Sequence, residues 1–305
     1  MNRPWNCFRP LPGGITKLTV ATGIVLACGL GTRADYLSDR KAAMELVQAG
    51  KHEEALSAFL KMAANTASDV QKSDALEQAA MRAQSLKRYD QALELARRIP
   101  LAPAAKTVQM RFLSEARKWR EILDTFKNED LDSWPEYVVG EASQLRGNAC
   151  CQLGDGQGAA ADLTRAAEYL TDSNSKGLAL NALGDTYAIL LKDDLQAVVA
   201  YRRVYQTDNV YKRSAAAMSV AAILTRQNKL AEALLELETI DLDKVKHPHW
   251  RGRMLTAYGS LLAQQGKRAE AIAKYREAVQ LQDLPPAQKI AYETALKDLT
   301  KAEAK

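Results

Sequence analysis

The chain has 305 residues, which is long enough for two domains, and its formal net charge is +5. The first 34 residues contain four basic residues and no acidic one, so the rest of the chain has 38 basic residues against 37 acidic ones. This near-neutral remainder gives no basis for nucleic-acid binding, and we expect no nucleic-acid partner.

The N-terminal segment has the pattern of an export signal. Basic residues precede an apolar run from Leu18 to Leu30, and small residues follow it. This run of 13 residues is shorter than the roughly 18–20 apolar residues of a membrane-spanning helix, which favours removal over anchoring. Thr32-Arg33-Ala34 predicts cleavage before Asp35. We therefore expect residues 1–34 to be the signal segment and the mature protein to be periplasmic or secreted.

Two alternatives to this cleavage stay open. Val25-Leu26-Ala27-Cys28 resembles a bacterial lipobox, in which Cys28 becomes a lipid-modified N-terminus that attaches the protein to a membrane. Gly29 and Leu30 continue the apolar run, however, so Cys28 also fits as an ordinary apolar residue. The second alternative is that the segment is retained as an anchor or does not direct export.

An internal repeat occupies most of the remaining chain. One position recurs every 36–38 residues, with a single shorter step of 30, at Ala55, Ala92, Ile122, Ala159, Ala197, Ala233 and Ala271. Periods of this size indicate stacked supersecondary units, each too small to bury its apolar face alone. Apolar residues follow helical spacing, and proline is absent from 136–247 and 249–284. The predicted fold class is all-α.

Individual copies of the repeat differ in clarity. The clearest copy consists of Leu255, Tyr258-Gly259, Leu262, a Gly266-Lys267 turn, and then Ala271, Tyr275 and Ala278. The copy that contains Gly184 needs one extra residue, which we place in the turn at 191–196. The third copy is degenerate and keeps only Met110, Ile122 and Phe126. Small residues such as Gly184 and Gly259 predict close contact between the two helices of a unit.

Over roughly residues 36–282 this pattern resembles tetratricopeptide repeats. The resemblance implies a right-handed superhelical solenoid of helix-turn-helix hairpins, with about seven repeats in residues 35–282. After Pro285-Pro286, apolar residues along one side of 287–305 predict a helix. We expect this C-terminal segment, 283–305, to cap the exposed end of the last hairpin.

The resemblance also implies a binding groove lined by the first helix of each repeat. Carrying the family's groove positions onto the chain gives Gln144, Asn148, Gln152, Asn181, Asp185, Arg226, Ser260 and Gln264. Amide side chains both donate and accept hydrogen bonds, which suits the backbone of a bound peptide. The family's carboxylate clamp is not reproduced, because Gln144 and Ala215 occupy the positions of its lysines. The alternative is a solvated groove wall without a specific ligand.

No combination of residues indicates catalysis, a cofactor or a metal. The Gly154–Gly158 run is not followed by the Lys-Ser/Thr of a phosphate loop, so we expect a turn there. His247-Pro248-His249 has no third ligand nearby, so we expect a loop rather than a metal site. Cys150 and Cys151 are neighbours in a helix, where adjacent Cα atoms have the wrong geometry for a disulfide.

The function that these observations predict is a non-enzymatic scaffold of the bacterial cell envelope that holds a protein or peptide in its groove. The alternative is a structural spacer that self-associates through its repeats.

Overall fold

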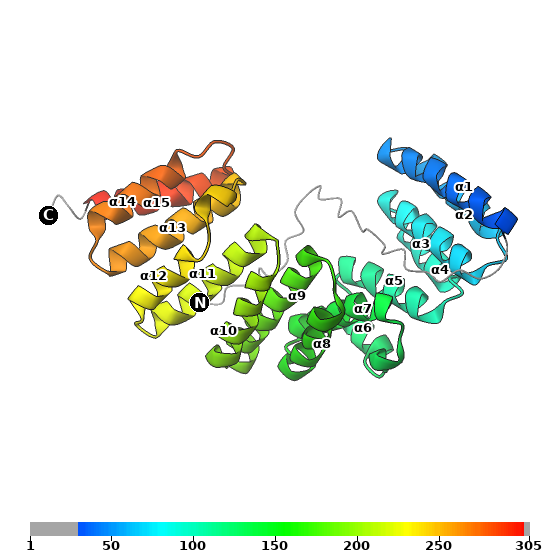
Figure 1. Ribbon diagram of the computed structural model, residues 1–305, viewed down its shortest axis with the longest axis horizontal. Coiled ribbons are helices and arrows are strands. Elements are labelled where there is room, and N and C mark those ends of the chain that lie inside the picture. The colour runs from blue at the N-terminus through cyan, green and yellow to red at the C-terminus, as the bar shows by residue number, and fades with distance from the viewer. Residues whose placement is uncertain (1–29, 302–305) are drawn as a thin grey trace. The chain divides into compact units, whose positions relative to one another are not determined.

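The computed structural model describes residues 30–301, which form helices, turns and loops without a strand (Figure 1). The predicted all-α class is confirmed. By its internal contacts the chain divides into two units, 1–153 and 154–305. Residues 1–29, with Cys28 and most of the predicted export segment, lie outside the described residues. Within the described part of the chain, no helix combines the length and the apolar composition needed to cross a membrane.

Unit 1 consists of three helical hairpins and one further helix. In chain order its elements are α1 (Leu30–Gln48), α2 (His52–Ala64), α3 (Asp69–Ser85), α4 (Tyr89–Arg97), α5 (Ala102–Glu115), α6 (Trp119–Phe126), the 3₁₀ turn η1 (Leu131–Ser133) and α7 (Glu136–Leu153). Each helix packs on the next one along the chain from α1 to α7. The core lies between these packed helices, and its largest fully buried side chains are Phe59, Leu76, Met110, Ile122 and Leu131.

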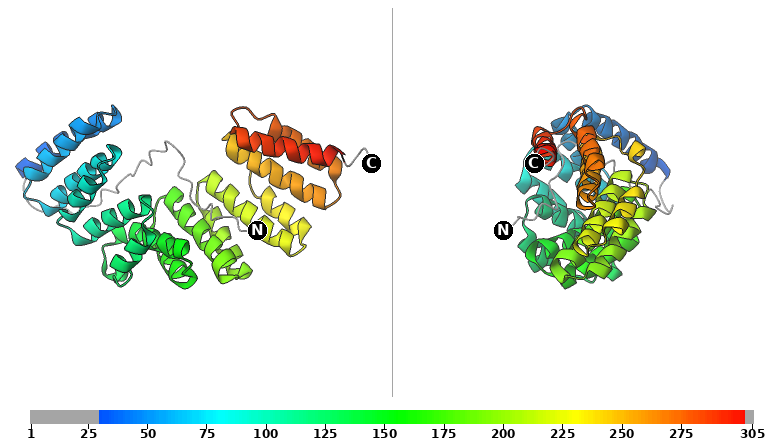
Figure 2. Two further views of the ribbon diagram at one scale, coloured as in Figure 1. Left: turned by 180° about the vertical axis from the view of Figure 1, so that it is seen from behind. Right: turned by 90° about the vertical axis from the view of Figure 1, so that its left-hand side faces the viewer.

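Unit 2 has the same construction. Its elements are α8 (Gly156–Tyr169), α9 (Ser173–Asp185), the π-helical segment η2 (Thr186–Leu191), α10 (Asp194–Arg203), η3 (Val204–Gln206), α11 (Val210–Arg226), α12 (Leu230–Glu238), η4 (Leu242–Lys244), α13 (Pro248–Gln264), α14 (Arg268–Val279) and α15 (Pro286–Lys301). Here too each α-helix packs on the next one from α8 to α15. The left view of Figure 2 shows the helices of this unit following one another in chain order.

Every hairpin turn contains a residue with left-handed backbone. These residues are Gly50, Lys87, Arg117, Gly154, Lys192, Asn228 and Gly266, and each lies five positions before the recurring marker residue of its second helix. A left-handed residue ends an α-helix by letting the next N–H groups bond back to its last turn, as when the N–H of Arg88 donates to the carbonyl of Ala83. Because four of the seven are not glycine, the turns are set by the packing of the hairpin as well as by local preference.

The third hairpin, α5 and α6, has this same arrangement although its sequence is degenerate. Its turn contains Arg117, with a φ of 57°, and its three retained apolar residues, Met110, Ile122 and Phe126, are buried. The short step of 30 residues before Ile122 follows from the short loop 98–101 and from α5, which has 14 residues where α11 and α13 have 17.

Small residues on the first helices make room for aromatic rings on the second helices. A Cβ placed on Gly184 would lie 2.4 Å from the Tyr201 ring, and one placed on Gly259 would lie 2.7 Å from the Tyr275 ring. Both distances are far below van der Waals contact, so the close helix approach predicted at Gly184 and Gly259 is confirmed.

The extra residue of the fifth repeat lies in the first helix and not in the turn. Gly184 and Lys192 are separated by one residue more than their counterparts in the other hairpins, such as Gly259 and Gly266. The interval contains η2, where the π-helical turn accommodates one additional residue. Our placement of this residue in the 191–196 turn is wrong, because a wider helical turn keeps the hairpin geometry intact.

The last helix, α15, packs on α14 and on the core of the final hairpin. Tyr292 of α15 is buried against Leu255 and Ala278. The side chain of Gln288 pairs with Nδ1 of His249 at 2.9 Å and donates to the backbone carbonyl of His249 at 3.1 Å. His249 therefore joins α13 to α15 in this unit.

Candidate functional site

The first helices of unit 1 are joined by charged side chains that form a continuous series, which we call the charged ladder. Its members are Arg40 on α1, Asp74 and Glu77 on α3, Arg111 on α5 and Glu141 on α7. Arg40 donates two hydrogen bonds to the Asp74 carboxylate, at 2.7 and 3.1 Å, and the Tyr36 hydroxyl donates to the same carboxylate at 2.7 Å. These bonds connect α1 directly to α3.

Arg111 is the centre of the ladder, because it bridges carboxylates from the helices on both sides. It donates to Glu141 at 2.7 and 3.0 Å and to Glu77 at 3.2 Å. The Arg111 side chain is only 16% exposed. Burial raises the pKa of Glu77 above its ordinary value, the nearby Glu141 adds to the rise, and Arg111 opposes it. Three charged groups thus share one partly buried site that carries a formal charge of −1.

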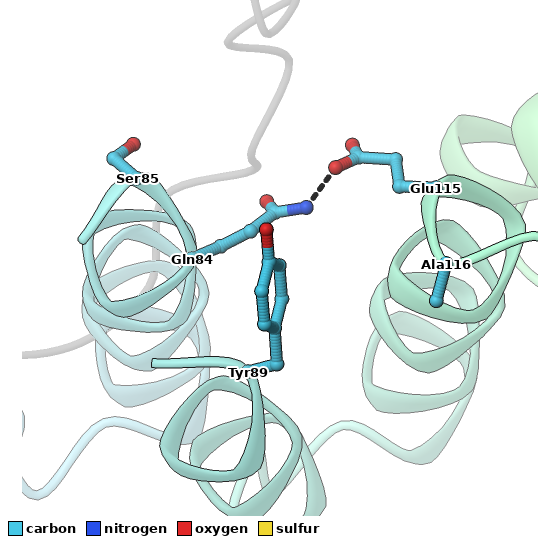
Figure 3. A pocket seen from close by; sticks show the side chains of 5 residues that line it. All are labelled: Gln84, Ser85, Tyr89, Glu115 and Ala116. Atoms are coloured by element: carbon cyan, nitrogen blue, oxygen red, sulfur yellow. Dashed lines mark hydrogen bonds between the residues drawn. The ribbon is translucent and has the colours of Figure 1, made fainter. Parts of the chain in front are cut away.

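A pocket of about 480 Å³ adjoins one end of the ladder, where α3 and α5 finish (Figure 3). Its lining residues are Gln84, Ser85, Tyr89, Glu115 and Ala116. Gln84 extends from α3 and donates to the Glu115 carboxylate on α5, and Tyr89 rises from the start of α4 beneath them (Figure 3). Burial raises the pKa of Glu115, and the Arg111 charge acts against this rise.

The ladder and the pocket together form one surface, which we call the first-helix face of unit 1. It contains four carboxylates, those of Asp74, Glu77, Glu115 and Glu141, and two guanidinium groups, those of Arg40 and Arg111. Two aromatic rings on this face are exposed, Tyr89 and Tyr137. Desolvation and then the Glu77 charge raise the pKa of Tyr137. The surface therefore combines excess negative charge with accessible aromatic side chains.

The repeated hairpin geometry decides the fold. In each repeat a left-handed turn residue precedes the buried marker by five positions, and at Gly184 and Gly259 an aromatic ring of the second helix occupies the space that a side chain would fill. The fold is that of a tetratricopeptide-repeat protein.

Among known proteins, the chain is similar to solved structures only. Neither a protein-family model nor a curated protein matches the sequence. The chain is similar to a tetratricopeptide repeat protein from Parabacteroides merdae, with 15% identity, 87% of this chain and 98% of that chain covered, and a TM-score of 0.46. It is also similar to a chain in the structure of Naa15/Naa10 bound to HypK-THB, with 14% identity, 88% and 42% coverage, and a TM-score of 0.39.

Of the groove residues predicted from the tetratricopeptide pattern, three lie on α7 of unit 1. Gln144, Asn148 and Gln152 follow Glu141 along this helix and are half-buried. The side-chain oxygen of Asn148 is buried and has no hydrogen-bond partner among the described residues. These amides therefore extend the charged ladder along α7.

Two of the predicted groove residues in unit 2 are engaged in bonds inside the protein. The Asn181 amide donates to the carbonyls of Gly177, at 2.9 Å, and of Lys212, at 3.2 Å, which ties α9 to α11. The Asp185 carboxylate accepts from the Tyr201 hydroxyl at 2.5 Å. Asn181 therefore joins two successive repeats, and Asp185 joins the two helices of its own hairpin.

The other three predicted residues of unit 2 are exposed. Arg226 forms an ion pair with Asp194 at 2.8 Å, which links α11 to α10. Ser260 and Gln264 lie one turn apart on α13, with 3.5 Å between their side-chain donor and acceptor. Among the described residues there is no cluster of three or more His, Cys, Asp or Glu that could hold a metal ion.

Sequence reasoning missed the charged ladder, because it carried the family's groove positions onto the fourth and later repeats only. The register needed to find it was already present in the sequence. Gln144 lies as far before its marker Ala159 as Glu77 lies before Ala92 in the second repeat. Asn148 lies as far before Ala159 as Arg111 lies before Ile122 in the third repeat. What the sequence does not contain is the pairing of these charges across residues 77, 111 and 141.

Proposed function

We propose that the protein is a non-enzymatic interaction scaffold, and that its first-helix face of unit 1 binds a basic segment of a partner protein. The observation that carries the proposal is the charge of this face, where four carboxylates surround two guanidinium groups. A segment with lysine or arginine side chains complements this charge, and electrostatic complementarity gives both specificity and fast association.

The ion pairs inside the ladder hold the binding groups in fixed positions. Arg111 fixes the Glu77 and Glu141 carboxylates through three hydrogen bonds, so fewer side chains lose freedom when a partner binds. The exposed rings of Tyr89 and Tyr137 offer flat surfaces for a cation or an aliphatic stem. Gln144, Asn148 and Gln152 add amide groups for the backbone of the bound segment.

We also propose that the protein is located in the bacterial cell envelope. The N-terminal segment supports this location, because its basic start and apolar run match a secretory signal. The mass of the intact protein from its own host tests the assignment. We expect a chain that begins at Asp35 or at a lipid-modified Cys28. A chain that keeps Met1–Lys17 would contradict the export proposal and leave the scaffold proposal untouched.

The binding proposal is tested by the variant Glu115→Gln, which removes one negative charge without changing side-chain shape. A partner captured by the wild-type protein from envelope fractions is purified, and its affinity for both proteins is measured by calorimetry. We expect the variant to bind about three- to tenfold more weakly, as a single charge pair contributes about 1 kcal/mol.

The matched control is Glu121→Gln, an equally conservative change at an exposed position on the second helix α6. It should bind as the wild type does. Equal loss in both variants would indicate a general effect of net charge, and no loss at Glu115 would remove this face as the binding surface.

A further inference from the structure

The second helices differ between the two units at their most exposed positions. In every repeat these positions lie two residues before and two residues after the buried marker. In unit 1 they are Glu53, Ser57, Asp90, Glu94, Arg120 and Asp124, all charged or polar. In unit 2 they are Leu195 and Val199 on α10, Ala231 and Leu235 on α12, and Ala269 and Ala273 on α14, with Gln157 and Ala161 on α8. The exposed apolar character is therefore a property of unit 2 and not of the repeat.

Four of these residues lie at equivalent exposed positions on two successive second helices, and we call them the unit 2 stripe: Leu195, Val199, Ala231 and Leu235. The exposed fractions of Leu195, Val199 and Leu235 are 73%, 51% and 63%. The two helices are linked at their C-terminal ends, where Arg202 of α10 donates to Glu236 of α12 at 2.7 Å. Large exposed apolar side chains that gather on one face of a soluble protein mark interaction sites.

The charges beside the stripe have opposite signs on its two helices. Helix α10 ends in Arg202 and Arg203, whereas α12 contains three glutamates and no basic residue. Arg202 pairs with Glu236 within the chain. Arg203, near the end of α10, and Glu238, at the end of α12, form no ion pair with any described residue. Each helix thus has one charge available for a partner.

We propose that the unit 2 stripe binds the same stripe of a second copy of this chain. As equivalent second helices of successive repeats, α10 and α12 run in the same direction, so a twofold axis parallel to them, at the exposed surface over the line midway between them, places α10 of one copy on α12 of the other. Val199 then faces Leu235 of the second copy, Leu195 faces Ala231, and Arg203 lies beside Glu238. Under this rotation apolar side chains of one copy meet apolar side chains of the other, and each Arg203 meets a Glu238 of opposite charge. This self-complementarity favours a second copy over an unrelated partner.

The apolar character of the stripe fits the centre of a larger interface. Stable interfaces bury about 800 Å² on each partner and have an apolar centre within a polar rim. The stripe supplies the centre, the small exposed residues Ala269 and Ala273 allow close approach beside it, and the charges at Arg203 and Glu238 belong to the rim. This surface is distinct from the first-helix face of unit 1, so self-association goes beyond the proposed partner binding.

Sedimentation velocity of the protein purified from its own host, over about a hundredfold range of concentration, tests the proposal. We expect the wild type to change from monomer to dimer with concentration. Leu195→Glu and Leu235→Glu should each weaken the dimer at least tenfold without changing helicity or the melting midpoint, because both side chains are exposed in the monomer. Ile290→Glu is the matched control, since Ile290 is 62% exposed on α15. It should dimerise as the wild type does.

A charge exchange tests the orientation. Arg203→Glu and Glu238→Arg should each weaken the dimer, and the double variant should recover it, because each residue meets the other across the axis. A wild type that stays monomeric, stripe variants that dimerise normally, or a double variant without recovery would overturn the proposal. A monomer that instead captures a helix of another protein on the stripe would overturn it as well.

Partner binding at the first-helix face of unit 1 is measured on the same variants and should be unchanged, so failure of one proposal is distinguishable from failure of the other.

Discussion

At the scale of single residues, glycine positions and shared ion pairs fix how the helices of each unit pack. Gly184 and Gly259 both face a tyrosine, but the two rings differ in freedom. Tyr201 is buried and its hydroxyl donates to Asp185 at 2.5 Å, so it cannot move away, whereas Tyr275 is half-buried. We therefore expect Gly184→Ala to cost about 2–3 kcal/mol and Gly259→Ala about 1 kcal/mol, the range seen for overpacking. Urea midpoints of both variants measure the difference, and equal midpoints would contradict it.

The ladder residue Arg111 gives a prediction that depends on pH. Arg111→Met leaves Glu77 and Glu141 without their cation, and we expect a loss of about 2–3 kcal/mol at pH 7, below the 3–5 kcal/mol of a fully buried pair. Glu77 already has a raised pKa, so its folded form binds a proton more readily than its unfolded form, and stability falls as pH rises through the folded pKa.

Removing Arg111 raises this pKa further, because Arg111 is the group that opposes the rise. The loss should consequently be smaller at acidic pH than at pH 7, because protonation of Glu77 removes the charge that lacks its cation. Thermal melts at both pH values measure it. Arg97→Met, at an exposed arginine whose nearest carboxylate is 4.0 Å away, should leave stability unchanged at either pH. A loss that does not vary with pH would show that packing and not charge is responsible.

At the scale of the element, the π-helical segment η2 is an insertion that the first helix of the fifth repeat accommodates. Deleting Ile189, an exposed residue inside η2, should convert the π-turn to an α-turn and restore the spacing of the other repeats. We expect the deletion variant to fold with a melting midpoint close to that of the wild type. Deleting Ala222, an exposed residue of the regular helix α11, should strongly destabilise the protein, because it shifts the buried face of that helix. Similar losses in the two variants would contradict this explanation of η2.

Elements also show how far the sequence predicts the fold. The markers at Ala55 and Ala271, the small residues at Gly184 and Gly259, and the glycine turns at Gly50 and Gly266 are local signals, and together they place the hairpins because they recur in phase. The turns at Lys87, Arg117, Lys192 and Asn228 have no such signal, because their left-handed backbone is imposed by the packed helices. The charged ladder is more difficult to predict from the sequence than these turns. Its bonds, together with the bond from Tyr36 to Asp74, join residues 30 to 38 positions apart and depend on how successive hairpins stack.

At the scale of the whole molecule, the two units present different surfaces on equivalent helices. Unit 1 has its excess negative charge on the first helices and polar residues at the exposed second-helix positions, whereas unit 2 has exposed leucine and valine there. Repeats of one architecture can thus have separate roles, because the buried positions fix the hairpin and leave the exposed positions free to vary. Binding of a basic segment is assigned to unit 1 and self-association to unit 2.

The most direct test of the central claim is site-specific photo-crosslinking in the host cell. A photoreactive residue is placed in turn at Tyr89 and Tyr137, on the first-helix face of unit 1, and at Ser57 and Glu94, exposed positions on the second helices of the same unit. We expect Tyr89 and Tyr137 to crosslink to one common protein through a lysine- or arginine-rich segment, and the crosslinks to weaken when Glu115→Gln is added. Crosslinks to that protein from Ser57 and Glu94 but not from Tyr89 and Tyr137 would contradict the assignment of the binding face.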